Sequence, residues 1–190
     1  MTARRQWTIV LIILVLLGGG LAAATHYLGD ELFPVTLGSR APDFHAATLG
    51  PAPQTKTLDD YRGDVVVLNI WATWCVPCQV EMPSLEKLHQ AMGPRGLKIV
   101  AVSVDDPGPG VDQRIRDFAA RYGLTFQILH EGTGKIEKLY QTTGYPETFV
   151  IGRDGVIRKK VIGASDWNSD GHRLAGQLIA QKLCGDVLAR

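Results

Sequence analysis

The stretch Asn69–Cys78, NIWATWCVPC, decides the fold because it joins an apolar run to two cysteines that are separated by two residues. Upstream, Val65–Ile70 is a nearly continuous β-branched apolar run, which is typical of a strand buried on both faces. Downstream, apolar residues at helical spacing predict a helix over Val76–Met92. The two cysteines therefore lie where a buried strand meets the N-terminus of a helix.

This position predicts redox chemistry at Cys75. Free backbone N–H groups at a helix start stabilise a thiolate and lower a cysteine pKa from ~8.5 to roughly 3.5–7.5. The thiolate is the attacking species in thiol–disulfide exchange. Cys78 lies one helical turn further on, where it can attack a mixed disulfide at Cys75. We predict that Cys75 is the exposed nucleophile and that Cys78 is the resolving cysteine.

Two other readings of the pair are half of a zinc site and an inert structural disulfide. Zinc needs two further ligands at matching spacing. The third cysteine, Cys184, is distant, and the five histidines form no pair. We interpret Cys184 as a small buried hydrophobe rather than a third redox partner. The sequence thus predicts no metal site and no cofactor.

The composition is that of one ordinary globular domain with a short extra segment. The chain has 190 residues, 45% hydrophobic and 21% charged, with a net charge of +1. A nearly neutral chain without a basic stripe argues against nucleic acid as a partner. A domain of this size needs no disulfides to hold its core, which favours a chemical over an architectural role for the cysteines.

The N-terminal segment is predicted to be a membrane anchor. Trp7–Ala24 is uncharged and apolar, and as a helix it would span ~27 Å, close to the hydrocarbon thickness of a bilayer. Arg4 and Arg5 precede it, so the positive-inside rule places the N-terminus in the cytoplasm. We predict a single-pass anchor at residues 1–25 in the inner membrane, with the domain in the periplasm or on the outer face. A signal peptide cleaved near Ala22–Ala24 is the alternative.

The remaining chain is interpreted as a linker over residues 26–37 and one domain over residues 38–190. Gly50–Thr57 is predicted to be a hairpin or loop. Further strands are predicted at Leu97–Val104, Phe126–Leu129, Thr148–Ile151 and Val156–Ile162, and helices at Val111–Tyr122, Gly134–Tyr140 and Asn168–Cys184. This order predicts an α/β fold with a central mixed sheet flanked by helices.

Four separated motifs carry a resemblance to a known family. They are Ala41–Phe44, the active-site stretch from Asn69 to Pro83, Gly144–Phe149 and Gly163–Trp167. With these motifs in this order, the chain resembles the thioredoxin superfamily and, within it, the membrane-anchored TlpA/ResA/CcmG (DsbE) branch. The resemblance implies a thioredoxin fold with an N-terminal β extension.

The resemblance also implies a substrate-binding surface. Pro146 would follow a cis peptide bond and face the two cysteines, and Tyr145 would offer backbone groups to an extended substrate. Trp74 and Pro77, which flank Cys75, would form the rest of this surface.

One departure from the family pattern moves the expected proton acceptor. Cytoplasmic thioredoxins carry a buried aspartate six residues before the nucleophilic cysteine, where this chain has Asn69. Glu81 lies one turn after Cys78, and the resemblance to ResA-like proteins implies that a carboxylate at this position does this work. We predict Glu81 as the general base that assists Cys78. The other reading is a solvated surface carboxylate.

The function that follows is reduction of disulfides in extracytoplasmic client proteins. By resemblance, the clients would be apocytochrome c, in cytochrome c maturation, or copper-site proteins of oxidase assembly. A membrane thiol transporter of the DsbD or CcdA type would supply the electrons. The alternatives are an oxidant that introduces disulfides and, less favoured, a Sco-type copper metallochaperone, which would need three residues between the cysteines. Leu68 and Ala72 stand where a peroxiredoxin has its proline and its threonine or serine, which argues against a peroxidase.

Overall fold

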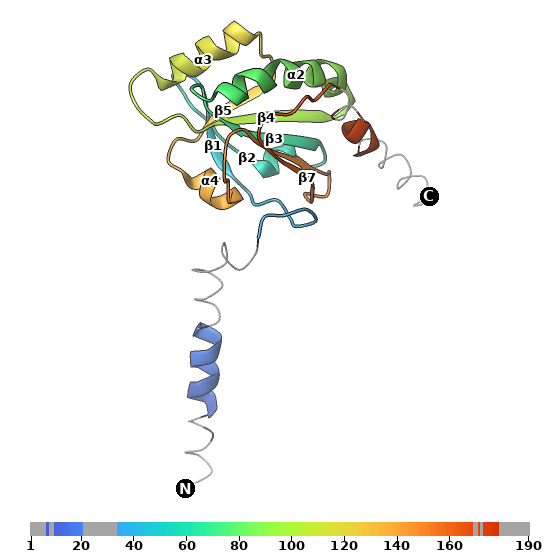
Figure 1. Cartoon of the computed structure of the whole chain (residues 1–190). Coiled ribbons are helices and arrows are strands. Elements are labelled where there is room, and N and C mark those ends of the chain that lie inside the picture. Colours follow the sequence, from blue (N-terminus) through green and yellow to red (C-terminus); the bar gives the residue numbers. More distant parts are fainter. Residues whose placement is uncertain (1–6, 8–9, 21–33, 169–170, 172, 179–190) are drawn as a thin grey trace. The chain divides into compact units, whose positions relative to one another are not determined.

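The computed structural model describes Trp7 and residues 10–20, 34–168, 171 and 173–178 (Figure 1). The chain divides into two units, Met1–Pro34 and Val35–Arg190. In the first unit, Trp7 and residues 10–20 are helical, and the large apolar side chains from Val10 to Leu17 are exposed. Within the described residues, no helix combines the length and the apolar character needed to cross a bilayer. Parts of the predicted anchor and most of the predicted linker, residues 26–37, lie outside the described residues.

The second unit is built on a seven-stranded mixed sheet with strand order β2-β1-β5-β4-β3-β6-β7. Its centre is parallel, because β3 pairs with β4 and β4 with β5 in the same direction. The remaining pairings are antiparallel. The strands are β1 (His45–Thr48), β2 (Thr55–Thr57), β3 (Val65–Trp71), β4 (Leu97–Ser103), β5 (Gln127–His130), β6 (Glu147–Ile151) and β7 (Ile157–Ile162). The predicted α/β class with a mixed sheet is confirmed.

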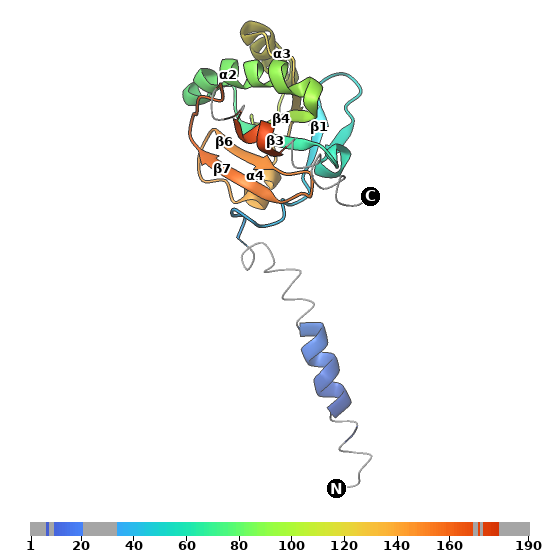
Figure 2. The ribbon, with the colours of Figure 1, turned by 90° about the vertical axis from the view of Figure 1, so that its right-hand side faces the viewer.

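Helices cover both faces of this sheet (Figures 1 and 2). On one face lie α2 (Val76–Met92) and α3 (Val111–Tyr122), and on the other lies α4 (Lys135–Tyr140). This is the expected result when two parallel strand–helix–strand units have the same handedness and the next connection crosses back. Two short 3₁₀ helices, η1 (Leu58–Tyr61) and η2 (Gly93–Arg95), complete the fold.

A C-terminal helix, helical at Gly171 and at residues 173–178, packs against α2. A Cβ atom at Gly171 would lie 3.2 Å from Cδ2 of Leu88, so the two helices approach closely at this glycine. The rest of the predicted final helix and Cys184 lie outside the described residues, so the interpretation of Cys184 stays a prediction.

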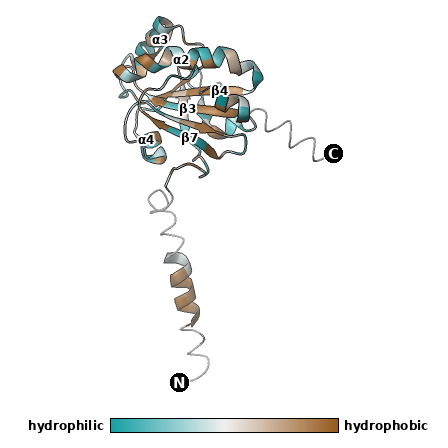
Figure 3. Ribbon diagram, turned by 45° about the vertical axis from the view of Figure 1, so that its right-hand side comes forward, coloured by the Kyte–Doolittle hydropathy of each residue, from teal (hydrophilic) through white to brown (hydrophobic). Residues whose placement is uncertain are grey.

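The core is centred on β3, in which all seven residues are buried. Figure 3 shows hydrophobic residues concentrated in β3 and β4, whereas hydrophobic and hydrophilic residues are mixed along α2 and α3. Trp71, at the end of β3, is fully buried and its ring centroid lies 4.7 Å from that of Phe118 in α3. A strand this apolar on both faces requires helices on both sides, which is the observed arrangement.

Some predicted boundaries of strands and helices are wrong, because the apolar pattern reports burial and not backbone hydrogen bonding. Phe126 is only 5% exposed, yet β5 begins one residue later, because burial alone does not require a ladder hydrogen bond. The predicted final helix begins too early, since the N–H of Asn168 donates to Oδ1 of Asp166 in a turn. By contrast, the predicted hairpin or loop at Gly50–Thr57 contains β2, which pairs with β1 and forms the N-terminal β extension that the family resemblance implied.

Candidate active site

Cys75 and Cys78 form a disulfide at the start of α2. Cys75 is the N-cap residue of this helix, and the backbone N–H of Cys78 donates to its Sγ at 3.2 Å. Pro77 lies within the first helical turn, where a proline costs no helical hydrogen bond. A helix N–H group therefore points at the predicted nucleophilic sulfur, which favours its thiolate once the disulfide is reduced.

The two sulfurs differ in accessibility less than the sequence predicted. Cys75 is 4% exposed and Cys78 is fully buried. The expectation of an exposed Cys75 was wrong in degree, because in the disulfide form its side chain turns toward the N–H groups of α2. The order of exposure still makes Cys75 the sulfur that an incoming group meets first.

The loop before Cys75 is held by a clamp that the sequence reasoning missed. Asp105 is buried and accepts hydrogen bonds from the N–H of Thr73 at 2.9 Å and from its hydroxyl at 2.5 Å. Ser103 donates to the same carboxylate at 2.6 Å, and Gln79 donates to the carbonyl of Thr73 at 3.2 Å. The available signal was topological, since polar residues just after parallel strands meet at the carboxyl edge of a sheet.

The second loop of the site precedes β6. Because β6 is antiparallel to β3, with Glu147 opposite Ile70, its beginning lies at the same sheet edge as the Cys75 loop. The Tyr145–Pro146 peptide bond is cis, and Pro146 is buried. The rings of Tyr145 and Trp74 meet edge to face with centroids 5.6 Å apart. The structure thus brings Trp74 and Tyr145, far apart in sequence, together beside the disulfide.

Glu81 is buried below this surface, at 1% exposure. Its Oε1 accepts a hydrogen bond from Nε1 of Trp167 at 2.6 Å and from the N–H of Ser165 at 3.3 Å. Its Oε2 accepts from Nδ2 of Asn69 at 3.1 Å, and the same amide donates to Oγ1 of Thr148 at 2.8 Å. The reading of Glu81 as a solvated surface carboxylate is therefore wrong.

Comparison with known proteins identifies the family. The model of the AhpC/TSA family matches residues 37–160. The chain is 35% identical over 156 residues to the thiol-disulfide oxidoreductase ResA of Geobacillus thermodenitrificans, which covers 82% of this chain and 85% of that protein. The chain belongs to the thioredoxin-like AhpC/TSA family. It is a thiol–disulfide oxidoreductase whose disulfide-forming pair is Cys75 and Cys78.

Further relatives agree with this family assignment. The thioredoxin-like protein YneN of Bacillus subtilis is 33% identical over 167 residues, covering 84% of this chain and 91% of YneN. A solved structure described as a putative thiol:disulfide interchange protein DsbE from Chlorobium tepidum matches with a TM-score of 0.65 and 25% identity. That match covers 76% of this chain and 97% of the DsbE chain.

Within this thioredoxin-like site, Glu81 has an unusual titration. Burial raises the pKa of its carboxyl above the ordinary value of 4.5, although hydrogen bonds from Trp167, Ser165 and Asn69 lower it again in part. The folded protein therefore holds this proton more tightly than the unfolded chain. The stability that Glu81 contributes is complete below about pH 4.5 and is lost as the pH rises through its folded pKa.

We expect the Glu81→Gln variant to keep its stability as the pH rises, because glutamine does not ionise. At pH 8 the oxidised variant should have a higher free energy of unfolding than the wild type, by about 1.4 kcal/mol for each unit by which folding raises the pKa of Glu81. At pH 4 the two free energies of unfolding should be equal. Urea unfolding at both pH values measures the difference. Glu86→Gln is the matched control on the same helix: burial alone would raise the pKa of Glu86, but hydrogen bonds from Thr125 make it lower than usual. This control should lose stability at pH 8, and equal effects in both variants would contradict the argument.

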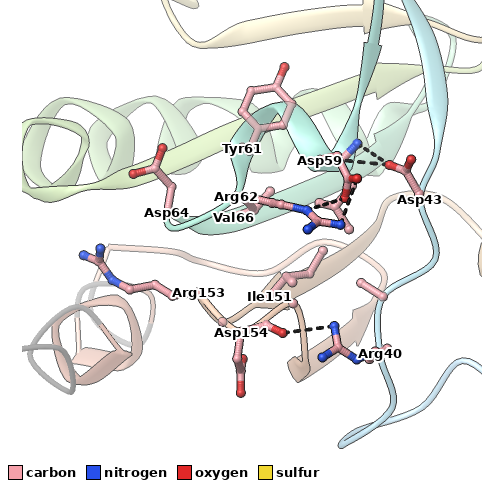
Figure 4. A pocket seen from close by; sticks show the side chains of 14 residues that line it. Arg40, Asp43, Asp59, Tyr61, Arg62, Asp64, Val66, Ile151, Arg153 and Asp154 are labelled. Atoms are coloured by element: carbon pink, nitrogen blue, oxygen red, sulfur yellow. Dashed lines mark hydrogen bonds and ion pairs between the residues drawn. The ribbon is translucent and has the colours of Figure 1, made fainter. Parts of the chain in front are cut away.

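A cavity at the other end of the sheet is separate from the redox site (Figure 4). It has a volume of about 470 Å³ and lies near Val66 and Ile151, which are opposite each other where β3 begins and β6 ends. Among its charged side chains, Arg62 and Asp59 form a bidentate pair, and Arg153 donates to the backbone carbonyl of Gly63. Among the described residues, no group of three or more histidine, cysteine or acidic side chains is arranged to hold a metal ion.

Proposed function

We propose that this thiol–disulfide oxidoreductase is an extracytoplasmic enzyme that reduces disulfides in client proteins. The observation that carries the proposal is the Cys75–Cys78 disulfide at the N-terminus of α2, with Cys75 the more accessible sulfur. Apocytochrome c and copper-site proteins of oxidase assembly are the proposed clients, and a membrane dithiol transporter of the DsbD or CcdA type is the proposed electron donor.

In the first step the Cys75 thiolate attacks one sulfur of a client disulfide. The client S–S bond breaks, one client sulfur leaves as a thiolate, and the other becomes bonded to Cys75. The N–H of Cys78, which donates to Sγ of Cys75 in the oxidised form, favours the thiolate needed for this attack.

In the second step Cys78 attacks Sγ of Cys75. The mixed disulfide breaks, the second client sulfur leaves as a thiolate, and two electrons have passed to the client. Cys78 is fully buried and needs a proton acceptor before it can attack. Glu81 lies one turn further along α2, on the same helix face, and we assign it this role as general base. The enzyme is left with the Cys75–Cys78 disulfide, which the donor dithiol must reduce.

An apolar surface around the disulfide supports a polypeptide as substrate. Three large apolar side chains within two residues of a cysteine are exposed, namely Trp74 by 61%, Val76 by 66% and Val80 by 71%. Ile162, exposed by 61%, lies opposite Glu147, the residue after the cis proline. Pro77 is also exposed beside Cys75. We propose that an extended client segment lies over these side chains and pairs with the backbone of Tyr145.

The proposed location rests on the N-terminal segment. Its exposed apolar side chains from Val10 to Leu17, with Arg4 and Arg5 before them, suit a helix that crosses the inner membrane with the catalytic unit outside. Such a compartment is oxidising, so a reductase there needs electrons delivered through the membrane.

The experiment that tests the proposal is trapping with Cys78→Ala in intact cells. Without Cys78 the second step is blocked, so Cys75 should accumulate as mixed disulfides with its clients in the membrane fraction, and these can be identified by mass spectrometry. The double variant Cys75→Ala/Cys78→Ala, which keeps Cys184, is the control and should trap nothing. Absence of trapped protein in the Cys78→Ala cells would overturn the protein-directed function.

The direction of electron flow is read in the same cells from the wild-type chain. After acid quenching and alkylation, a reductase should be found mostly as the dithiol, and mostly as the disulfide when the membrane dithiol donor is absent. A chain that is mostly oxidised in both conditions would instead be an oxidant. A membrane-impermeant maleimide should label the reduced cysteines only if the domain lies outside the cytoplasm.

A further inference from the structure

The turn that precedes the C-terminal helix is fastened to one face of α2. Two α2 residues one turn apart, Glu81 and Ser84, hold it. The N–H of Ser165 and the indole of Trp167 donate to Oε1 of Glu81, at 3.3 and 2.6 Å. The N–H of Trp167 donates to the hydroxyl of Ser84 at 3.2 Å, and the carbonyl of Ser165 lies 3.3 Å from the same hydroxyl. The backbone and the ring of this turn are therefore both tied to the helix that carries the cysteines.

The position of the Trp167 ring is also fixed from outside α2. The residue is 1% exposed, and a Cβ atom at Gly171 would lie 3.1 Å from its Cε3 atom, so glycine at this position lets the ring pack against the C-terminal helix. The ammonium group of Lys159, on β7, lies 5.5 Å from the ring centroid, within the range of a cation–π contact. An indole held on several sides presents its N–H to Glu81 in one orientation.

The groups around the Glu81 carboxylate show why the indole N–H of Trp167 matters for its ionised form. Its three hydrogen-bond donors among the described residues are all neutral. Lys159 contacts the ring and not the carboxylate, while Asp166 accepts hydrogen bonds from Asn168. Glu147 forms an ion pair with Lys160 and accepts a hydrogen bond from the N–H of Thr143. The indole makes the shortest bond to a buried carboxylate for which the described part of the chain supplies no ion-pair partner. A hydrogen bond to a charged acceptor is worth more than one to a neutral acceptor.

We infer that Trp167 is a positioning residue for proton transfer at Cys78: its indole N–H orients the Glu81 carboxylate and favours its ionised form. The inference rests on the proposed role of Glu81 as general base. It assigns to the C-terminal turn, nearly ninety residues from the cysteines, a part in setting the pH range in which the resolving step runs.

The test is Trp167→Phe in the full chain in detergent micelles, which keeps most of the ring volume and removes the N–H. Carbon-13 NMR of the glutamate carboxyl groups in the oxidised form should show the pKa of Glu81 rising by about one unit or more. The acidic limb of the pH profile for insulin reduction should move upward by the same amount, since Glu81 must be ionised to accept a proton.

Trp71→Phe is the matched control. Trp71 is also fully buried, and its indole nitrogen has no hydrogen-bond partner among the described residues. This variant should leave the pKa of Glu81 unchanged. An equal shift in both variants, or no shift in Trp167→Phe, would overturn the positioning role.

A second measurement needs no change at Trp167. In the wild-type chain one indole N–H resonance should move with pH as Glu81 ionises, and it should not move in Glu81→Gln. An indole spectrum independent of pH would also overturn the inference. If Glu81→Gln reduces insulin at the wild-type rate and with the wild-type pH profile, the proposed role of Glu81 fails. If that variant is slow but Trp167→Phe leaves the Glu81 pKa unchanged, only the positioning role fails.

Discussion

Cys75→Ser should reduce insulin no faster than the dithiol in the buffer does alone. The hydroxyl of serine does not ionise near neutral pH, so the helix N–H groups that favour a thiolate have no nucleophile to activate. Cys78 cannot replace it, because Cys78 is fully buried and lies inside the helix rather than at its N-cap. The measurement is the initial rate of insulin reduction with dithiothreitol as the electron source.

Cys78→Ala is the informative comparison for this variant. It keeps Cys75 at the helix N-cap, so the variant, reduced beforehand and then freed of dithiothreitol, should still release one thiol for each enzyme molecule in a single rapid phase and then stop. If Cys75→Ser showed this phase and Cys78→Ala did not, the roles of the two cysteines would be exchanged.

The parts of the site that are local in sequence were predictable from it. Cys75, Cys78 and the helix that starts between them follow from an apolar strand and a two-residue spacing, and α2 has the predicted bounds. Tyr145 and Pro146 came from a family resemblance, and the pairing of β6 with β3 explains why they lie at the same end of the sheet as the cysteines. The spacing within a short motif fixes the relative positions of its residues, so the chemistry of the motif does not depend on distant parts of the fold.

The parts that depend on contacts between distant segments were not predictable. Asp105 contacts Thr73 only because β4 and β3 end at the same sheet edge. Trp167 reaches Glu81 only because a turn after β7 docks on α2. Nothing in the local pattern of either residue distinguishes a polar group that holds the active site from one that faces solvent. The burial of Glu81 likewise depends on this turn, so its titration could not be read from the helix alone.

The second large effect is expected at Asn69, where the chain differs from cytoplasmic thioredoxins. Asn69 is fully buried, and its amide donates to both Glu81 and Thr148. In Asn69→Asp both donors are lost and a second carboxylate lies against that of Glu81. Two buried carboxylates at hydrogen-bond distance cannot both ionise without a large cost, so one of them should stay protonated at neutral pH. We expect the oxidised variant to lose about 3–5 kcal/mol of its free energy of unfolding at pH 7.

The pH dependence and a double variant separate this cause from a simple packing defect. The pair holds a proton more tightly when folded, so the loss should shrink as the pH falls toward the ordinary carboxyl range, as measured by urea unfolding from pH 8 to pH 4. In Asn69→Asp/Glu81→Gln only one carboxylate remains, and the new amide can donate to it, so most of the loss at pH 7 should be recovered. An equal loss with and without Glu81 would mean that the site rejects the aspartate itself. Recovery would mean that this buried site accommodates one carboxylate, so that placing the proton acceptor at Glu81 requires a neutral donor at position 69.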